Sequence, residues 1–146
     1  MVLKIKKLNE KVEIPQYATN GSAGMDLRAC IDSDVVLEPG CRAMISTGLA
    51  ISLESADYVA YIYARSGLAV KNGVTLSNCV GVIDSDYRGE IKVGLINQSD
   101  KAYTISNGER IAQMVIAPVI VPEICVCDEL DETERADGGF GSTGKR

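Results

Sequence analysis

Short runs in which apolar and polar residues alternate cover most of the first 116 positions, and turn-forming residues separate them. An alternation with a period of two favours β-strands, because successive side chains of a strand point to opposite faces. The pattern predicts about ten short strands at close spacing, which is typical of an all-β sandwich or closed barrel. The clearest lie at 34–37, 41–47, 49–53, 58–64, 74–78, 91–97, 102–105 and 110–116, with weaker ones at 2–7 and 12–14.

The segment 65–73 breaks this pattern. Ser66 is expected to cap a single helical turn, and the pair Asn72-Gly73 marks the end of that turn. A helix start beside Arg65 predicts an anion site. The alternative for this segment taken alone is that Arg65 is a surface charge and Ser66 only a cap.

The length and charge of the chain restrict the classes of function. A chain of 146 residues can bury its own core as one domain. Its net charge of −5 argues against a general binder of nucleic acids or acidic membranes, since such partners require a broad positive field. We therefore expect no nucleic-acid partner and no membrane partner. The longest apolar run, 111–124, is interrupted by polar residues and prolines and is too short to span a bilayer.

Cysteine and histidine usage narrow the chemistry further. The five cysteines have no CxxC spacing, and no apolar signal segment follows the Lys-rich start, so we expect reduced thiols and a cytoplasmic location. Cys125 and Cys127 fit alternating strand residues better than a redox pair. The chain has no histidine, which argues against a catalytic zinc or iron site. A carboxylate is then the leading candidate for proton transfer.

The segment 81–90, GVIDSDYRGE, places carboxylates, a tyrosine and an arginine between two apolar runs. Its acidic, turn-prone middle predicts a β-hairpin whose return strand is 91–97. For this motif taken alone, a solvated surface turn is the alternative. A second hairpin turn is predicted at 106–109, SNGE.

The composition changes after Pro122, which predicts a β core at 1–122 and a C-terminal arm at 123–146. Residues 128–137 are strongly charged, and a glycine-rich motif follows them. So dense a run of glycines predicts a frayed tail where it has no partner. Phe140, however, lies among hydroxyl and amide groups that together could close over a base and its phosphates.

Five segments, taken in order, resemble the trimeric deoxyuridine triphosphatase (dUTPase) family along nearly the whole chain: AGMDLRA at 23–29, RSGLA at 65–69, GVIDSDYRGE at 81–90, GERIAQM at 108–114 and ERADGGFGSTG at 134–144. The resemblance implies a jelly-roll-like β fold with one short helix and a flexible C-terminal arm. It also implies a homotrimer with sites at subunit interfaces, and Mg²⁺-dependent hydrolysis of dUTP to dUMP and pyrophosphate. That reaction limits uracil incorporation into DNA and supplies dUMP for thymidylate synthesis. Ala64 and Ala136 depart from the family, which usually has proline and glycine there.

The resemblance assigns recognition of the nucleoside to the central segment. Asn78 matches the side chain that pairs with uracil, and backbone groups around Val82, Ile83 and Lys92 would complete that pairing. Tyr87 matches the ring that packs against the deoxyribose and leaves no room for a ribose 2′-hydroxyl.

The same resemblance assigns the reacting and phosphate-binding groups. Asp84 matches the carboxylate that orients and activates the water attacking the α-phosphorus, and Asp86 is given a structural role. Asp26 matches the acid that holds the water shell of a magnesium ion, which the triphosphate itself ligates. The remaining matches would bind the substrate. Most would bind phosphate, the phenylalanine would cover the uracil ring, and the glutamine is a polar group near the phosphates: Arg65, Ser66, Gly67, Gln113, Arg135, Phe140, Gly141, Ser142 and Thr143.

Two other functions are compatible with such a fold. A deoxycytidine triphosphate deaminase would be expected to have a catalytic glutamate near the hairpin and an RSS-type helix start, whereas this chain has Asp84 and RSG. A non-catalytic nucleotide sensor or jelly-roll interaction module would bind dUTP without releasing pyrophosphate. A water-activating carboxylate weighs against a pure binder, which has no use for one.

Overall fold

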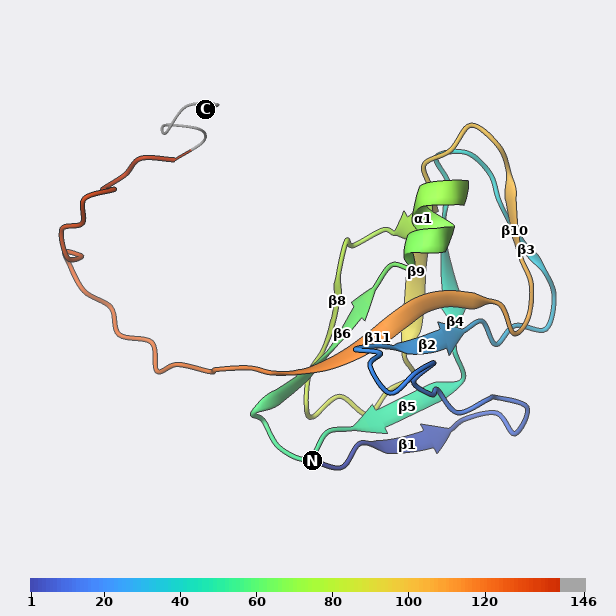
Figure 1. Ribbon diagram of the computed structural model, residues 1–146, viewed down its shortest axis with the longest axis horizontal. Coiled ribbons are helices and arrows are strands. Elements are labelled where there is room, and N and C mark those ends of the chain that lie inside the picture. Colours follow the sequence, from blue (N-terminus) through green and yellow to red (C-terminus); the bar gives the residue numbers. More distant parts are fainter. Residues whose placement is uncertain (140–146) are drawn as a thin grey trace.

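The computed structural model describes residues 1–139, and within this range eleven strands and one short helix form a β-rich body (Figure 1). The elements are β1 (Lys4–Lys7), β2 (Met25–Arg28), β3 (Val35–Leu37), β4 (Arg42–Ser46), β5 (Leu49–Ser52), β6 (Tyr58–Tyr63), α1 (Ser66–Asn72), β7 (Val74–Leu76), β8 (Gly81–Ile83), β9 (Lys92–Asn97), β10 (Tyr103–Ile105) and β11 (Arg110–Pro118). The all-β class expected from the period of two is confirmed. The weak strand expected at 12–14 does not form, although Val12 is buried.

All strand pairs are antiparallel, and they form four small sheets. The largest has the order β2-β11-β6-β8, and a three-stranded sheet has the order β4-β9-β7. Two-stranded sheets join β1 to β5 and β10 to β3. Within the described residues, no strand pairs with the strand that follows it in sequence. Each connection therefore joins two strands that are not hydrogen-bonded neighbours. Such connections are typical of jelly-roll and Greek-key folds.

Both predicted hairpins are therefore wrong as pairings, although both turns are present. The strand before the acidic loop, β8, pairs with β6, whereas the strand after it, β9, pairs with β4 and β7. At 106–109 the Glu109 N–H donates to the Ser106 carbonyl (3.2 Å), but β10 pairs with β3 and β11 with β2 and β6. A turn is a local property of its residues, while the partner of a strand depends on which sheet buries its apolar face.

The short helix begins and ends close to the expected positions. Gly73 ends α1 in the left-handed conformation (φ 67°), and its N–H donates to the Ala69 carbonyl at 3.0 Å. The expected cap at Ser66 is wrong: Arg65 occupies the N-cap position, without a capping side-chain hydrogen bond, and Ser66 is the first helical residue. Arg65 still has an extended backbone (φ −88°, ψ 126°), and the helical conformation begins at Ser66, one residue earlier than a cap at Ser66 would give.

The core lies between the sheets. Alternate residues of β9 are buried, as the sequence pattern predicts, and they pack with buried residues of β2, β6 and β11 in one hydrophobic cluster. The largest side chains of this cluster that are almost fully buried are Leu27, Leu37, Ile45, Leu49, Ile91, Leu95, Ile105, Ile111 and Met114. The single helix of the described range has seven residues, and no helix there is long and apolar enough to cross a membrane.

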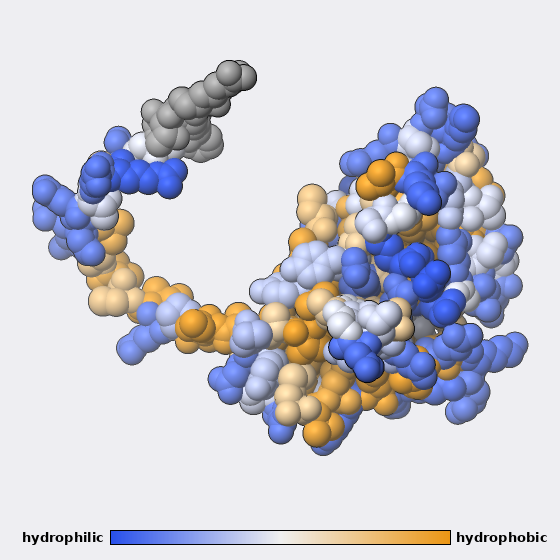
Figure 2. Space-filling view, viewed as in Figure 1, coloured by the Kyte–Doolittle hydropathy of each residue, from blue (hydrophilic) through white to orange (hydrophobic). Residues whose placement is uncertain are grey.

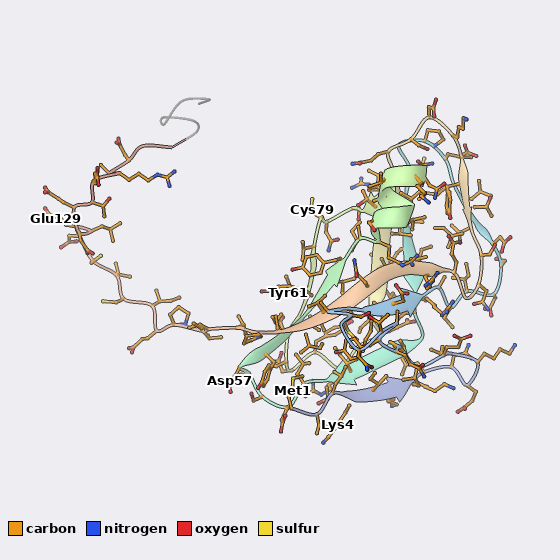
Figure 3. The ribbon with its side chains drawn as sticks, in the orientation of Figure 1. Met1, Lys4, Asp57, Tyr61, Cys79 and Glu129 are labelled. Carbon is orange, nitrogen blue, oxygen red and sulfur yellow. The ribbon has the colours of Figure 1, made fainter. Side chains whose placement is uncertain are left out.

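Residues 119–139 follow β11 without a further strand or helix and extend away from the body (Figures 1 and 3). The near half of this segment is apolar (Figure 2). Ile120, Ile124 and Val126 are 89%, 89% and 92% exposed, so these side chains have almost no contact with the chain's own core. Cys125 and Cys127, expected as strand residues, lie outside any strand.

Candidate active site

The end of β8 and the loop after it border a hollow of about 570 Å³. It is lined by Met44, Val82, Ile83, Asp84, Tyr87, Glu90 and Lys92. β8 ends at Ile83, so Asp84 is the first residue that leaves the sheet. Its carboxylate is exposed and accepts no hydrogen bond from the described residues. A free carboxylate at the mouth of a hollow can accept a hydrogen bond from a water molecule.

Contacts within the loop itself fix the tyrosine of this site. The Tyr87 N–H donates to the Asp84 carbonyl (3.2 Å), and the Tyr87 hydroxyl donates to the Glu90 carbonyl (3.0 Å). The ring lies so close to Gly89 that a Cβ at that position would overlap it. A side chain at position 89 would therefore displace the Tyr87 ring, which forms one wall of the hollow.

A second polar cluster lies where β2, β6 and β11 meet. The Asp26 carboxylate accepts a hydrogen bond from Arg65 Nε on one oxygen (2.8 Å) and from Arg110 Nη1 on the other (3.1 Å). Arg65 also donates from Nη1 to the Arg110 carbonyl (3.2 Å). One carboxylate between two guanidinium groups leaves an excess positive charge, and the donors of each arginine that are not engaged can bind an anion.

Gln113 ties the middle of this cluster together. It lies between Asp26 of β2 and Tyr63 of β6 in the strand register, and its Nε2 donates to the Ala64 carbonyl at 2.9 Å. The side chain thus holds the residue that precedes Arg65. Gly67 borders a separate small hollow together with Arg65 and Arg110, and Ser66 is exposed beside it.

A tyrosine–glutamate pair lies next to the arginines. The Tyr103 hydroxyl donates to Glu109 Oε1, and Glu109 Oε2 accepts the Ser106 N–H (3.2 Å). Burial, and then the hydrogen bond and negative charge of Glu109, raise the pKa of Tyr103 to about 12, while nearby Arg65 acts in the opposite direction. The pair closes the turn that leads into Arg110 at the start of β11.

The two clusters lie at opposite ends of the β6–β8 pair. Gly81 is opposite Ile62 and Ile83 is opposite Ala60, so Asp84 follows at the Val59 end, six residues along β6 from Arg65. At about 3.3 Å per residue this is a separation of about 20 Å. Figure 3 marks the direction of β6, from Asp57 just before its first residue to Tyr61 further along it, with Cys79, which precedes β8, beyond.

The other residues expected at the site are not brought into either cluster. Asn78 is exposed, and its amide nitrogen lies 3.8 Å from where a Cβ of Gly81 would be, outside the lining of the hollow. Arg135 lies in the extended C-terminal segment, where its Nε donates to the Gly138 carbonyl (2.9 Å). Phe140, Gly141, Ser142 and Thr143 lie outside the described residues.

A family model described as dUTPase matches residues 10–144 of the chain. The chain belongs to the dUTPase family. A deoxyuridine 5′-triphosphate nucleotidohydrolase of Hydrogenobaculum sp. is 56% identical over 146 residues, all of both chains. The enzyme of the same name from Idiomarina loihiensis is 49% identical over 139 residues, which are 95% of this chain and 92% of the relative.

Solved dUTPase structures have the same fold. A mutant of the Staphylococcus bacteriophage 80alpha dUTPase with dUpNHpp has a TM-score of 0.88 at 29% identity over 98% of each chain. A mutant of the dUTPase from phage phi11 of S. aureus, described with a structural Mg(II) ion, has a TM-score of 0.81 at 25% identity over 90% of this chain and all of that one. The family and the jelly-roll-like fold expected from the sequence are therefore confirmed.

Three residues that line the hollow or contact Asp26 were not predicted from the sequence. Met44 lines the hollow from β4, and Glu90 lines it from the end of the loop. Arg110 completes the cluster around Asp26. Arg110 and Glu90 lie inside motifs that the sequence singles out, so their charge was a usable signal, whereas nothing in the sequence around Met44 marks it.

Proposed function

We propose that the chain hydrolyses dUTP to dUMP and pyrophosphate, which limits uracil incorporation into DNA and supplies dUMP for thymidylate synthesis. The observation that carries this proposal is the hollow beside β8, where an exposed carboxylate, Asp84, lies next to the fixed ring of Tyr87. The membership of the chain in the dUTPase family supports the substrate.

Asp84 is proposed to orient and activate the attacking water. Hydrolysis at the α-phosphorus needs a water molecule held in line with the leaving pyrophosphate, and a carboxylate at that place can also accept its proton. Tyr87 would pack against the deoxyribose, with Val82, Ile83 and Lys92 around the uracil. Asn78 would pair with the base from its position beside Gly81.

The cluster around Asp26 is proposed to bind the triphosphate. Arg65 would supply charge-assisted hydrogen bonds to phosphate oxygens, with Ser66, Gly67 and Gln113 beside it as further substrate-binding residues. Each Asp26 oxygen accepts one arginine hydrogen bond, and a carboxylate oxygen can accept two, so Asp26 can also hold a water molecule of a magnesium ion. A bound magnesium ion withdraws charge from the triphosphate.

A complete site would combine residues of different copies in a homotrimer. A triphosphate is far shorter than the separation of about 20 Å between Asp84 and Arg65 along β6 and β8, so one chain does not bring both groups to the same substrate. We further propose that residues 1–122 act as the core. Residues 123–146 would act as an arm that carries Arg135, Phe140, Gly141, Ser142 and Thr143 to a site. The five free thiols fit the reducing cytoplasm, which is the location that we propose.

Pyrophosphate release from dUTP, dCTP, dTTP and UTP, with and without magnesium, tests the proposal. We expect rapid release from dUTP only, and only with the metal, because a site that pairs with uracil leaves buried polar groups unpaired against cytosine. Purified chain that leaves dUTP intact in the presence of magnesium would refute the proposed activity.

A further inference from the structure

The loop 84–90 is held mainly by contacts within itself. Arg88 Nη1 donates to the carbonyls of Ser85 (2.7 Å) and Tyr87 (2.9 Å), and the Tyr87 contacts described above are also internal. Among residues 1–139, Glu90 is the one member of this loop with a hydrogen bond to a distant part of the chain. A self-closed loop can move as a unit unless something attaches it to the body.

Glu90 forms that attachment with its side chain. Its Oε1 accepts the Gly48 N–H at 2.9 Å, and its side chain is only 22% exposed. Its Oε2 lies 3.6 Å from Lys92 Nζ, but the lysine is half exposed, so this ion pair contributes little. At the same residue the backbone carbonyl accepts the Tyr87 hydroxyl (3.0 Å). Glu90 therefore connects the ring of Tyr87 directly to the β4–β5 corner.

That corner is a rigid anchor. Gly48 has a left-handed backbone (φ 66°), and a Cβ there would meet the side chains of Val12 and Cys30. The Gly48 carbonyl accepts the Leu8 N–H (2.8 Å), so both sides of its peptide backbone are engaged. Ile91, the residue that follows the loop, is bonded to the same corner, since its N–H donates to the Leu49 carbonyl (2.8 Å) and its carbonyl accepts the Thr47 hydroxyl (2.6 Å).

We propose that Glu90 is the positioning residue that holds Tyr87 against the sugar, and so sets the selectivity of the site for 2′-deoxyribose over ribose. The inference rests on the proposed function, in which the Tyr87 ring excludes the 2′-hydroxyl. A ring excludes an added hydroxyl only when it does not yield. The hydrogen bond from Gly48 to the Glu90 side chain adds to the backbone attachment at Ile91 and holds the loop side of Glu90 against the corner. This role requires a side chain at position 90 that is long enough to place an acceptor oxygen beside the Gly48 N–H. It does not require a negative charge.

Three variants of Glu90 separate the effect of side-chain length from that of charge. Glu90→Gln keeps the acceptor and the length but removes the charge, Glu90→Asp keeps the charge but is one methylene too short, and Glu90→Ala removes both. Glu38 is a suitable control position, because it is exposed in a distant turn and its side chain makes no hydrogen bond to the described residues. Glu38→Ala should leave every measured quantity unchanged.

The measurement is the ratio of kcat/KM for dUTP to kcat/KM for UTP, taken well below the melting temperature of each variant. We expect Glu90→Ala and Glu90→Asp to lower this ratio about tenfold, and Glu90→Gln to stay within about twofold of the parent chain. An unchanged ratio in the alanine and aspartate variants, or an equal loss in the glutamine variant, would overturn the proposal. A merely destabilising change would lower the melting temperature without changing the ratio.

Amide hydrogen exchange at Gly48 gives a second readout that needs no catalysis. Protection of this N–H should be retained in Glu90→Gln and lost in Glu90→Asp. Equal protection in both variants would contradict the inference even if the alanine variant failed to fold. Failure of the proposed function would be recognised separately, because the parent chain itself would then release no pyrophosphate from dUTP.

Discussion

Asp84 is exposed, lies at the end of a paired strand and has no side-chain hydrogen-bond partner among the described residues, so its carboxylate contributes little to the fold. We expect Asp84→Asn to lower the rate of dUTP hydrolysis about 10²–10⁴-fold, the usual contribution of a general base, with an unchanged melting temperature. Single-turnover release of pyrophosphate measures the rate. Asp100→Asn, at another exposed carboxylate, is the matched control. Near-normal turnover in Asp84→Asn would remove this residue from its proposed role.

Single residues could be predicted where their neighbours in space are also neighbours in sequence. Asp84 and Tyr87 lie in one motif, and the structure brings both to one hollow. Met44 could not be found in this way, because it reaches that hollow only through the pairing of β4 with β9, where it lies opposite Gly94. Arg110 lies within a recognised motif, but its contact with Asp26 depends on how β11 is aligned with β2.

The turn before β11 is an element whose stability should depend on pH. Because the pKa of Tyr103 is raised to about 12 from its usual 10.0, its hydroxyl stays protonated in the folded chain while the unfolded chain loses that proton above about pH 10. The contribution of the protonated Tyr103 hydroxyl to the free energy of unfolding is therefore fully present below pH 10 and is lost as the pH rises to about 12. We expect the difference in free energy of unfolding between the parent chain and Tyr103→Phe to shrink across this range.

Denaturant unfolding at several pH values between about 9 and 12 measures this difference. Tyr58→Phe serves as the control, because Tyr58 also packs against the core but its hydroxyl has no hydrogen bond to the described residues. Parallel pH profiles of the parent chain and Tyr103→Phe would show that folding does not raise the pKa of Tyr103.

Elements were easier to predict than their partners. The alternation of apolar residues located β6, β9 and β11 to within two residues at each end, because burial of one face is recorded in the local sequence. The pairing of β8 with β6 rather than β9 was not predictable from the same pattern. Every candidate partner is apolar on one face, so the choice is made by the packing of the complete core.

For the molecule as a whole, residues 119–139 contribute little to the packing of the core. The apolar side chains at 120, 124 and 126 are 89–92% exposed, so removing what lies beyond them takes little from the packing of residues 1–118. We expect deletion of residues 134–146 to abolish turnover and to leave the melting temperature nearly unchanged. Calorimetry and pyrophosphate release on the same preparation measure both quantities. A truncated chain that remains active would refute the arm as part of the site.

The separation of Asp84 from Arg65 makes a prediction about the assembly. If each site takes Asp84 from one copy and Arg65 from another, then Asp84→Asn and Arg65→Ala can complement one another, although each alone is inactive. In an equal mixture, a site is intact when the copy that supplies Asp84 is the Arg65→Ala variant and the copy that supplies Arg65 is the Asp84→Asn variant. Each condition is met in half of the cases, which gives about a quarter of the parent activity.

Unfolding the two variants together and refolding them as a mixture allows the copies to exchange. The same variants refolded separately and then combined without exchange are the control, and they should stay inactive. Sites that lie within one chain would give no recovery in either preparation, because every chain would lack one of the two groups. Recovery only after joint refolding would require Asp84 and Arg65 to act from different copies, as their positions at opposite ends of the β6–β8 pair suggest.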